Sequence, residues 1–244
     1  MDQPYYRADL ARIHHLGFGF HADDTAPGIL SLIAPMRGGL VVELGCGSGL
    51  LTRHLLDAGH RVIATDASPA MLSLATDLVG EAEEIRRLTL PDDPIPEADA
   101  IVSVGHVLSY LDDTAQVDRA LVSIARALRP GGVLAIDICD LEWAATRSDQ
   151  GSKGWVGKDW ALVTEFSVPS PSRYVRQMAM FTRNQDGTWR RDDERHDNVM
   201  VDTSKLPELL AAHGVEAVVG GSFGHEELPV GLRTIVGHKL LRSP

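Results

Sequence analysis

Short apolar runs alternate with amphipathic stretches between about Gly39 and Asp140. The stretches between the runs carry apolar residues at helical spacing, and this alternation is typical of a parallel sheet with crossover helices. The runs are rich in β-branched residues, which favour strands. Five strands are predicted, at Leu40 to Glu43, Arg61 to Thr65, Ile85 to Thr89, Ala100 to Val104 and Val133 to Ile138.

Local signals set the ends of the predicted helices. A helix from Leu50 to Ala58 ends before Gly59, and Ser68 followed by Pro69 begins the next one. The run RPGG at positions 129–132 ends a third helix, whose apolar face is formed by Val117, Leu121, Ile124 and Leu128.

The pattern changes after Asp140. A Gly/Ser/Lys loop from Ser148 to Lys158 leads into three extended segments, DWALVTEFSV, SRYVRQMAMFTR and TWRRDDERHDNVMV, which predict an antiparallel insertion. The pattern of the core then resumes. A helix from Ser204 to Ala212 precedes strands at Val215 to Gly220 and Arg233 to Leu241.

Composition limits the class of protein. The chain has 244 residues, of which 44% are hydrophobic and 23% charged, as is ordinary for a soluble globular protein. Its formal charge is −11, and no cluster of Lys and Arg stands out, so we expect no nucleic-acid partner. The N-terminus is polar and no apolar run approaches the roughly 20 residues of a membrane helix, so we expect a cytoplasmic protein without a membrane partner.

The segment VVELGCGSGLL, residues 41–51, places glycines at positions 45, 47 and 49 directly after the first predicted strand. Such a turn lets the backbone approach a ligand where any Cβ would intrude. The dinucleotide fingerprint needs its third glycine at position 50, which is Leu50, and the lysine of a P-loop is missing. Asp66 ends the second strand, where the ribose diol of a nucleoside would lie.

Four motifs together resemble the class I S-adenosylmethionine-dependent methyltransferases of the small-molecule type. They are VVELGCGSG, VIATDASPAML, ADAIVSVGHVLSYL and LRPGGVLAIDI, in the order and approximate spacing of that family. The resemblance implies S-adenosyl-L-methionine as cofactor. It also implies an α/β, doubly wound (Rossmann-like) fold with a seven-stranded mixed sheet, an N-terminal helical lid and a small antiparallel β insertion.

We expect one methyltransferase domain with four parts. Residues 1–38 form the lid helices, 39–141 the cofactor-binding core, 142–202 the antiparallel insertion on the substrate side, and 203–244 the C-terminal helix and strands. The expected oligomeric state is a monomer or a homodimer.

The resemblance assigns residues to the cofactor. The glycine turn lies against its methionine and ribose portions, and Asp66 accepts hydrogen bonds from the ribose hydroxyls. Thr89 and Leu90 stand where many members place an acidic residue near the adenine amine. Glu43 either approaches the ligand or only satisfies loop amides. The full expected set is Tyr6, Glu43, Gly45, Cys46, Gly47, Gly49, Asp66, Ala67, Met71, Thr89, Leu90 and Gly105.

His106 follows the fourth strand and is the candidate catalytic base, because imidazole titrates near working pH. The alternative is a histidine that contacts the cofactor or caps the next turn. The segment SVGHVL lacks the Asn/Asp-Pro-Pro-Tyr/Phe motif of many enzymes that methylate planar amides or base amines. This difference favours a small acceptor.

Aromatic and polar residues of the N-terminal segment and the insertion are candidates for the acceptor site. Asp137 and Asp140 lack the Asp-Asn pair that would complete a hard oxygen site, so we expect no metal. The candidate acceptor residues are His14, Phe18, Tyr110, Trp155, Trp160, Arg176 and His196.

These observations predict an enzyme that transfers a methyl group to an oxygen or nitrogen of a small metabolite, for example in specialised biosynthesis. Two alternatives stay open. A peptide or protein methyltransferase would need an open groove, whereas a non-catalytic, cofactor-binding regulatory protein would fill the space above the methyl group with side chains.

Overall fold

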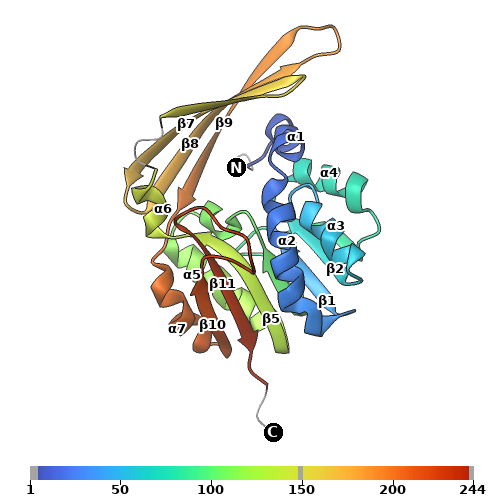
Figure 1. Cartoon of the computed structure of the whole chain (residues 1–244), viewed down its shortest axis with the longest axis vertical. Coiled ribbons are helices and arrows are strands. Elements are labelled where there is room, and N and C mark those ends of the chain that lie inside the picture. Colours follow the sequence, from blue (N-terminus) through green and yellow to red (C-terminus); the bar gives the residue numbers. More distant parts are fainter. Residues whose placement is uncertain (1–4, 148–150, 242–244) are drawn as a thin grey trace.

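A seven-stranded sheet lies at the centre of the computed structural model, which describes residues 5–147 and 151–241 (Figure 1). Its strand order is β3-β2-β1-β4-β5-β11-β10, and β11 runs antiparallel to both of its neighbours, whereas the other adjacent strands are parallel. The predicted doubly wound, mixed sheet is therefore confirmed. The strands are β1 (Leu40–Leu44), β2 (Arg61–Asp66), β3 (Glu84–Arg87), β4 (Ala98–Ser103), β5 (Leu128–Cys139), β10 (Val215–Gly220) and β11 (Leu232–Lys239).

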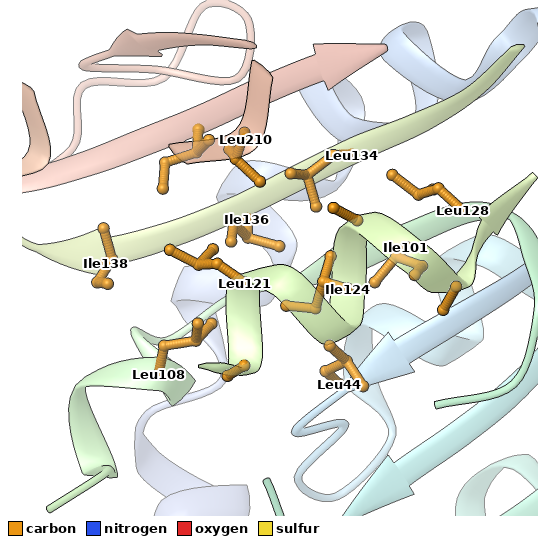
Figure 2. Close-up of a cluster of buried hydrophobic side chains, with 14 of the residues drawn as sticks. Leu44, Ile101, Leu108, Leu121, Ile124, Leu128, Leu134, Ile136, Ile138 and Leu210 are labelled. Carbon is orange, nitrogen blue, oxygen red and sulfur yellow. The ribbon is translucent and has the colours of Figure 1, made fainter. Parts of the chain in front are cut away.

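Helices cover both faces of this sheet because its strands carry apolar side chains on both sides. Val42 and Leu44 of β1 pack in the same core cluster as residues of α5 (Thr114–Ala127) and α7 (Leu206–Ala211). Figure 2 shows Leu44 in this cluster with Leu121 and Ile124 of α5. Val41 packs on the other face, with α2 (Phe20–Ile33) and α3 (Leu50–Asp57). The helix between β2 and β3, α4 (Pro69–Val79), is capped by Ser68, whose Oγ accepts a hydrogen bond from the Met71 amide at 3.2 Å.

The N-terminal helix α1 (Ala8–Gly17) lies between α4 and the insertion, at the carboxyl edge of the parallel strands (Figure 1). Two hydrogen bonds tie this region to the core. Ser68 Oγ donates to the Tyr6 carbonyl at 2.7 Å, and His15 Nδ1 lies 2.9 Å from Ser48 Oγ in the glycine turn. A short 3₁₀ turn, Ala34–Met36, joins α2 to β1.

The insertion is a four-stranded antiparallel sheet of β6 (Ser152–Val156), β7 (Trp160–Ser170), β8 (Arg173–Arg183) and β9 (Trp189–Val199), in that order. A short helix, α6 (Leu141–Ala145), connects it to β5, and the sheet stands over the carboxyl ends of the central strands (Figure 1). The expected loop from Ser148 to Lys158 is wrong over its middle part, because residues 152–156 pair with β7. Positions 148–150 of that loop lie outside the described residues.

Several predicted boundaries also shift. β5 begins at Leu128 and includes the RPGG run, because Leu128 pairs with Ala98 before a register shift. β3 covers Glu84–Arg87 and not Ile85 to Thr89. The predicted C-terminal helix divides into a 3₁₀ turn, Thr203–Lys205, and α7. A second 3₁₀ turn, η2 (Val107–Tyr110), follows β4. None of the helices seen in residues 5–147 and 151–241 has the length and apolar character to cross a membrane.

Candidate active site

The glycine turn after β1 needs its glycines for different reasons. Gly45 and Gly47 adopt φ angles of 71° and 54°, a region that residues with a Cβ rarely occupy. A Cβ on Gly45 would overlap the side chain of Val107. A Cβ on Gly47 would meet only Met71 Sδ, at 4.0 Å, and both residues border a cavity. The backbone at Gly47 is therefore open to a ligand.

Asp66 at the end of β2 is joined directly to this turn. Its Oδ2 accepts a hydrogen bond from the Gly47 amide at 2.9 Å, and its Oδ1 accepts one from the Ser68 amide at 2.8 Å. Burial raises the pKa of Asp66, while the hydrogen bonds from these amides lower it. The carboxylate thus fixes the turn and borders the same cavity.

The first cavity has a volume of about 720 Å³ and lies at the carboxyl ends of β1, β2 and β4. This is the edge at which open α/β sheets bind their ligands. Of the residues predicted to contact the cofactor, those that line this cavity are Tyr6, Gly45, Gly47, Asp66, Ala67, Met71, Thr89, Leu90 and Gly105.

Three residues of the predicted cofactor set, Glu43, Cys46 and Gly49, do not line the cavity. Glu43 is 1% exposed, and its Oε2 accepts a hydrogen bond from Thr52 Oγ1 at 2.5 Å. Burial raises the pKa of Glu43 to about 8, so this carboxyl group is protonated at neutral pH. A Cβ on Gly49 would lie 2.8 Å from Val79, so this glycine allows α3 and α4 to approach each other.

A second cavity of about 410 Å³ lies between α1, η2, α6 and the insertion sheet. Tyr6 and His14 contribute to the linings of both cavities, so the two spaces meet at these side chains. Of the predicted acceptor residues, those that line the second cavity are His14, Phe18, Trp155 and Arg176, and His106 lines it too.

Asp137 at the end of β5 holds the turn that carries His106. Its carboxylate is fully buried and accepts hydrogen bonds from the amides of His106, at 2.6 Å, and Gly105, at 3.0 Å. His21 Nε2 of α2 lies 2.9 Å from the same carboxylate. His106 adopts a φ of 51°, which is uncommon for a residue other than glycine. Two hydrogen bonds to a buried carboxyl group therefore hold the backbone at His106.

The His106 ring is half-buried and packs against an aromatic side chain. It stacks on Tyr110, with ring centroids 5.5 Å apart and planes 11° apart. Burial lowers the pKa of His106 well below its ordinary value, and the charge of Arg176 lowers it further. The imidazole is consequently neutral at pH 7, and its buried Nδ1 has no hydrogen-bond partner within the described part of the chain.

A hydrogen-bonded chain runs through the junction of the two cavities. Arg176 of β8 donates to Tyr110 Oη, which lies 2.8 Å from Tyr6 Oη. Arg176 Nη2 also lies 3.3 Å from His196 Nδ1, and His196 Nε2 lies 2.6 Å from Glu194 Oε1. Burial lowers the pKa of His196 to about 4, so His196 is neutral and carries its proton on Nε2.

Three predicted acceptor residues do not line the second cavity. His196 contacts the Arg176 guanidinium through its Nδ1. Trp160 packs in a hydrophobic cluster with Phe18 and Leu162. Tyr110 lines the first cavity instead, beside Arg176.

Sequence reasoning missed two aromatic residues of this cavity, Trp143 and Phe166, and the basic residues Arg147 and Lys153. The one feature of the sequence that could have identified them is their place relative to the predicted strands. Trp143 and Arg147 follow the end of β5, at the edge where ligands bind.

Comparison with known proteins points to one family. A family model described as a methyltransferase domain matches residues 42–136. YqeM of Bacillus subtilis, which carries the name of a methyltransferase, is 27% identical over 192 residues, or 73% of this chain and 74% of that protein.

Two solved structures share the fold over nearly the whole chain. An S-adenosylmethionine-dependent methyltransferase from Clostridium acetobutylicum superposes with a TM-score of 0.78 at 16% identity, covering 94% of this chain and 97% of the other. CalS10, an amino pentose methyltransferase from Micromonospora echinaspora, superposes with a TM-score of 0.73 at 19% identity, covering 98% and 100%. Residues 42–136, which hold the glycine turn and Asp66, thus match a methyltransferase domain, and the chain shares its fold with solved S-adenosylmethionine-dependent methyltransferases.

Proposed function

We propose that this methyltransferase acts on an oxygen or nitrogen atom of a small metabolite. The observation that carries the proposal is the second cavity, which adjoins the first at Tyr6 and His14. Its volume of about 410 Å³ is in the range of small-molecule sites. A non-catalytic binding protein would have side chains in this space, so the cavity favours the enzyme.

The boundary of the second cavity favours a small acceptor over a peptide. The cavity lies under α1 on one side and the insertion sheet on the other, and both elements contribute aromatic side chains such as Phe18 and Trp155. A peptide substrate would need a groove along the insertion. The fold is also shared with an enzyme named for its action on an amino pentose, which is an acceptor of small size.

The residues of the first cavity suit S-adenosylmethionine. Asp66 would accept hydrogen bonds from the ribose hydroxyls, and the exposed backbone of Gly47 leaves room for the nucleoside. Met71 and Leu90 supply apolar surface for the adenine ring. When bound, the cofactor supplies an electrophilic methyl group on a sulfonium.

The residues of this chain position the two reactants, shield them from water and supply a proton acceptor. Well-oriented reactants in a closed site reach effective molarities on the order of 10⁵ M, so positioning supplies much of the acceleration. His106 lines the acceptor cavity as a neutral imidazole, which accepts a hydrogen bond from an O–H or N–H of the acceptor. Asp137 keeps His106 in place through its backbone and leaves the ring free for the acceptor.

Calorimetric titration with S-adenosylmethionine and S-adenosylhomocysteine, followed by product detection over phenols, carboxylates and amines, tests this proposal. His106→Ala should reduce turnover at least 100-fold and leave the affinity for S-adenosylhomocysteine within twofold. The exposed His225 provides the matched control, because His225→Ala should change neither quantity. A protein that binds neither nucleoside refutes the proposal, and equal loss of affinity and turnover in His106→Ala refutes the role of His106.

A further inference from the structure

The second cavity is positively charged in an acidic protein. Arg147, Lys153 and Arg176 line it, and its lining contains no Asp or Glu. The chain as a whole has a formal charge of −11. In the ranges 5–147 and 151–241, none of these three cations forms an ion pair with a carboxylate. Arg147 and Arg176 are half-buried, and cations in such positions are usually paired, so their lack of a carboxylate partner needs an explanation.

Arg176 is the central cation, and its described partners are neutral. Its guanidinium contacts the Tyr110 hydroxyl and the neutral His196. Burial raises the pKa of Tyr110 well above its ordinary value, so this hydroxyl carries no charge at neutral pH. Glu194 contacts His196 rather than Arg176, and its carboxylate already accepts hydrogen bonds from the backbone amides of Tyr6 and Arg7. Within residues 5–147 and 151–241, the charge of Arg176 therefore has no direct counter-ion.

The nearby Asp137 does not supply that counter-ion. Its two oxygens accept hydrogen bonds from the amides of Gly105 and His106, and His21 Nε2 lies 2.9 Å from one of them. Neither Arg176 nor Arg147 forms a hydrogen bond with it among the residues that the structure describes.

Two buried donors around the cavity also lack partners. Trp143 Nε1 and Arg176 Nε have no hydrogen-bond acceptor within the described residues. Both groups can only donate. Buried donors without a partner are rare in folded proteins, so the missing partner is expected to be a group rich in acceptor oxygens.

The rest of the cavity suits a flat apolar body. Trp143 packs edge-on against Tyr174 at 6.0 Å, and Phe166 stacks on the same ring at 5.9 Å, while Phe18 and Trp155 meet at 5.5 Å. The Arg147 guanidinium lies 3.3 Å from the centre of a Trp143 ring, which holds this cation at the cavity. Aromatic walls of this kind favour planar ligands that stack.

We propose that the methyl acceptor is a small aromatic acid whose oxyanion binds Arg176. This inference rests on the proposed function, because it identifies the occupant of the acceptor cavity. A carboxylate and a phosphate share the required chemistry, since both accept two parallel hydrogen bonds from a guanidinium. The hydroxyl or amine of the same molecule would then face His106, which lines the same cavity.

The test is a calorimetric titration of the protein, with and without saturating S-adenosylhomocysteine, using ligand pairs that differ in charge. The pairs are 4-hydroxybenzoate with 4-hydroxybenzamide and 4-aminobenzoate with 4-aminobenzamide, and phenyl phosphate with phenol forms the phosphate arm. Each anion should bind at least tenfold more tightly than its neutral partner, because a hydrogen bond to a charged group contributes roughly a 10- to 100-fold factor. The pair with the larger ratio identifies carboxylate or phosphate as the natural group.

Arg176→Gln should remove the preference for the anion, and Arg176→Lys should restore part of it as a point charge. The control is Arg183→Gln on the same strand, at an exposed position that does not line the cavity. Unchanged affinity for S-adenosylhomocysteine shows that the Arg176 variants are folded. A tenfold loss of that affinity in Arg176→Gln would place Arg176 on the cofactor and overturn the inference.

Equal affinity for both members of every pair, or no binding of any of them, also overturns the inference. These outcomes can be distinguished from a failure of the proposed function by the binding of S-adenosylhomocysteine. If S-adenosylhomocysteine does not bind at all, the proposed function fails, whereas anion preference measured without the nucleoside would still support the site at Arg176.

Discussion

Glu43 offers the sharpest test of how burial sets protonation in this protein. Its carboxyl group is 1% exposed and hydrogen-bonded to Thr52, and burial raises its pKa from 4.5 to about 8. The folded chain therefore keeps a proton at Glu43 that the unfolded chain loses above pH 4.5. Stability from this group is fully present below pH 4.5 and is lost as the pH rises toward 8.

Glu43→Gln replaces the protonated carboxyl with a neutral group of the same shape. The variant should match the wild type near pH 4.5 and exceed it progressively as the pH rises. One pH unit corresponds to about 1.4 kcal/mol, so over the 2.5 units from 4.5 to 7 the unfolding free energy of the variant should exceed that of the wild type by roughly 3 kcal/mol. Urea unfolding at half-unit steps from pH 4.5 to 8 measures this difference.

The control is Glu227→Gln, which changes an exposed carboxylate in a loop and should give a curve parallel to the wild type. Glu43→Gln should also keep its affinity for S-adenosylhomocysteine within twofold, because Glu43 does not line the cofactor cavity. A constant difference between variant and wild type across this pH range would refute the raised pKa. A tenfold loss of affinity would show that Glu43 acts on the cofactor.

Three further variants test the site. Asp137→Asn should lower the unfolding free energy by roughly 2 kcal/mol, since the amide of Gly105 or His106 loses its carboxylate acceptor. Equal urea midpoints for the variant and the wild type would contradict this. Gly47→Ala should lower the unfolding free energy by about 1 kcal/mol, because Gly47 has a left-handed backbone conformation. It should also weaken the calorimetric affinity for S-adenosylhomocysteine at least tenfold, because the added Cβ enters the cavity. Full affinity would show that no ligand lies there. Burial lowers the pKa of His14 and His196 to about 4, so stability should fall as the pH drops from 6.5 to 4. His14→Gln should flatten that slope in urea unfolding, and an unchanged slope would rule the His14 contribution out.

The order of strands and helices in the core follows from the sequence alone. Apolar periodicity and caps such as Ser68 act over a few residues, so they can be read without knowing what packs against them. The approach of Gly47 to Asp66 follows from the same information, since Asp66 ends β2 and Gly47 lies in the turn after β1, the adjacent parallel strand. Boundaries such as the start of β5 depended on pairing with a distant strand and were therefore missed.

Side-chain direction was decided by the tertiary structure. Glu43 stands beside the glycine turn in sequence, but it lies on the face of β1 that meets α3, where Thr52 binds it. The acceptor cavity depends on the same kind of information. Its residues come from α1, from the segment after β4, from α6 and from three strands of the insertion.

The sequence by itself determined the alternating core, the glycine turn and the carboxylate after β2, because each rests on neighbouring residues or on the shared edge of a parallel sheet. Only the tertiary structure decided that Arg176 of β8 lies against Tyr110 of η2, 66 residues away, with no acidic partner beside it in the described part of the protein. The free energy of a buried charge depends on the groups around it, and folding brings together the groups around Arg176 from distant parts of the sequence.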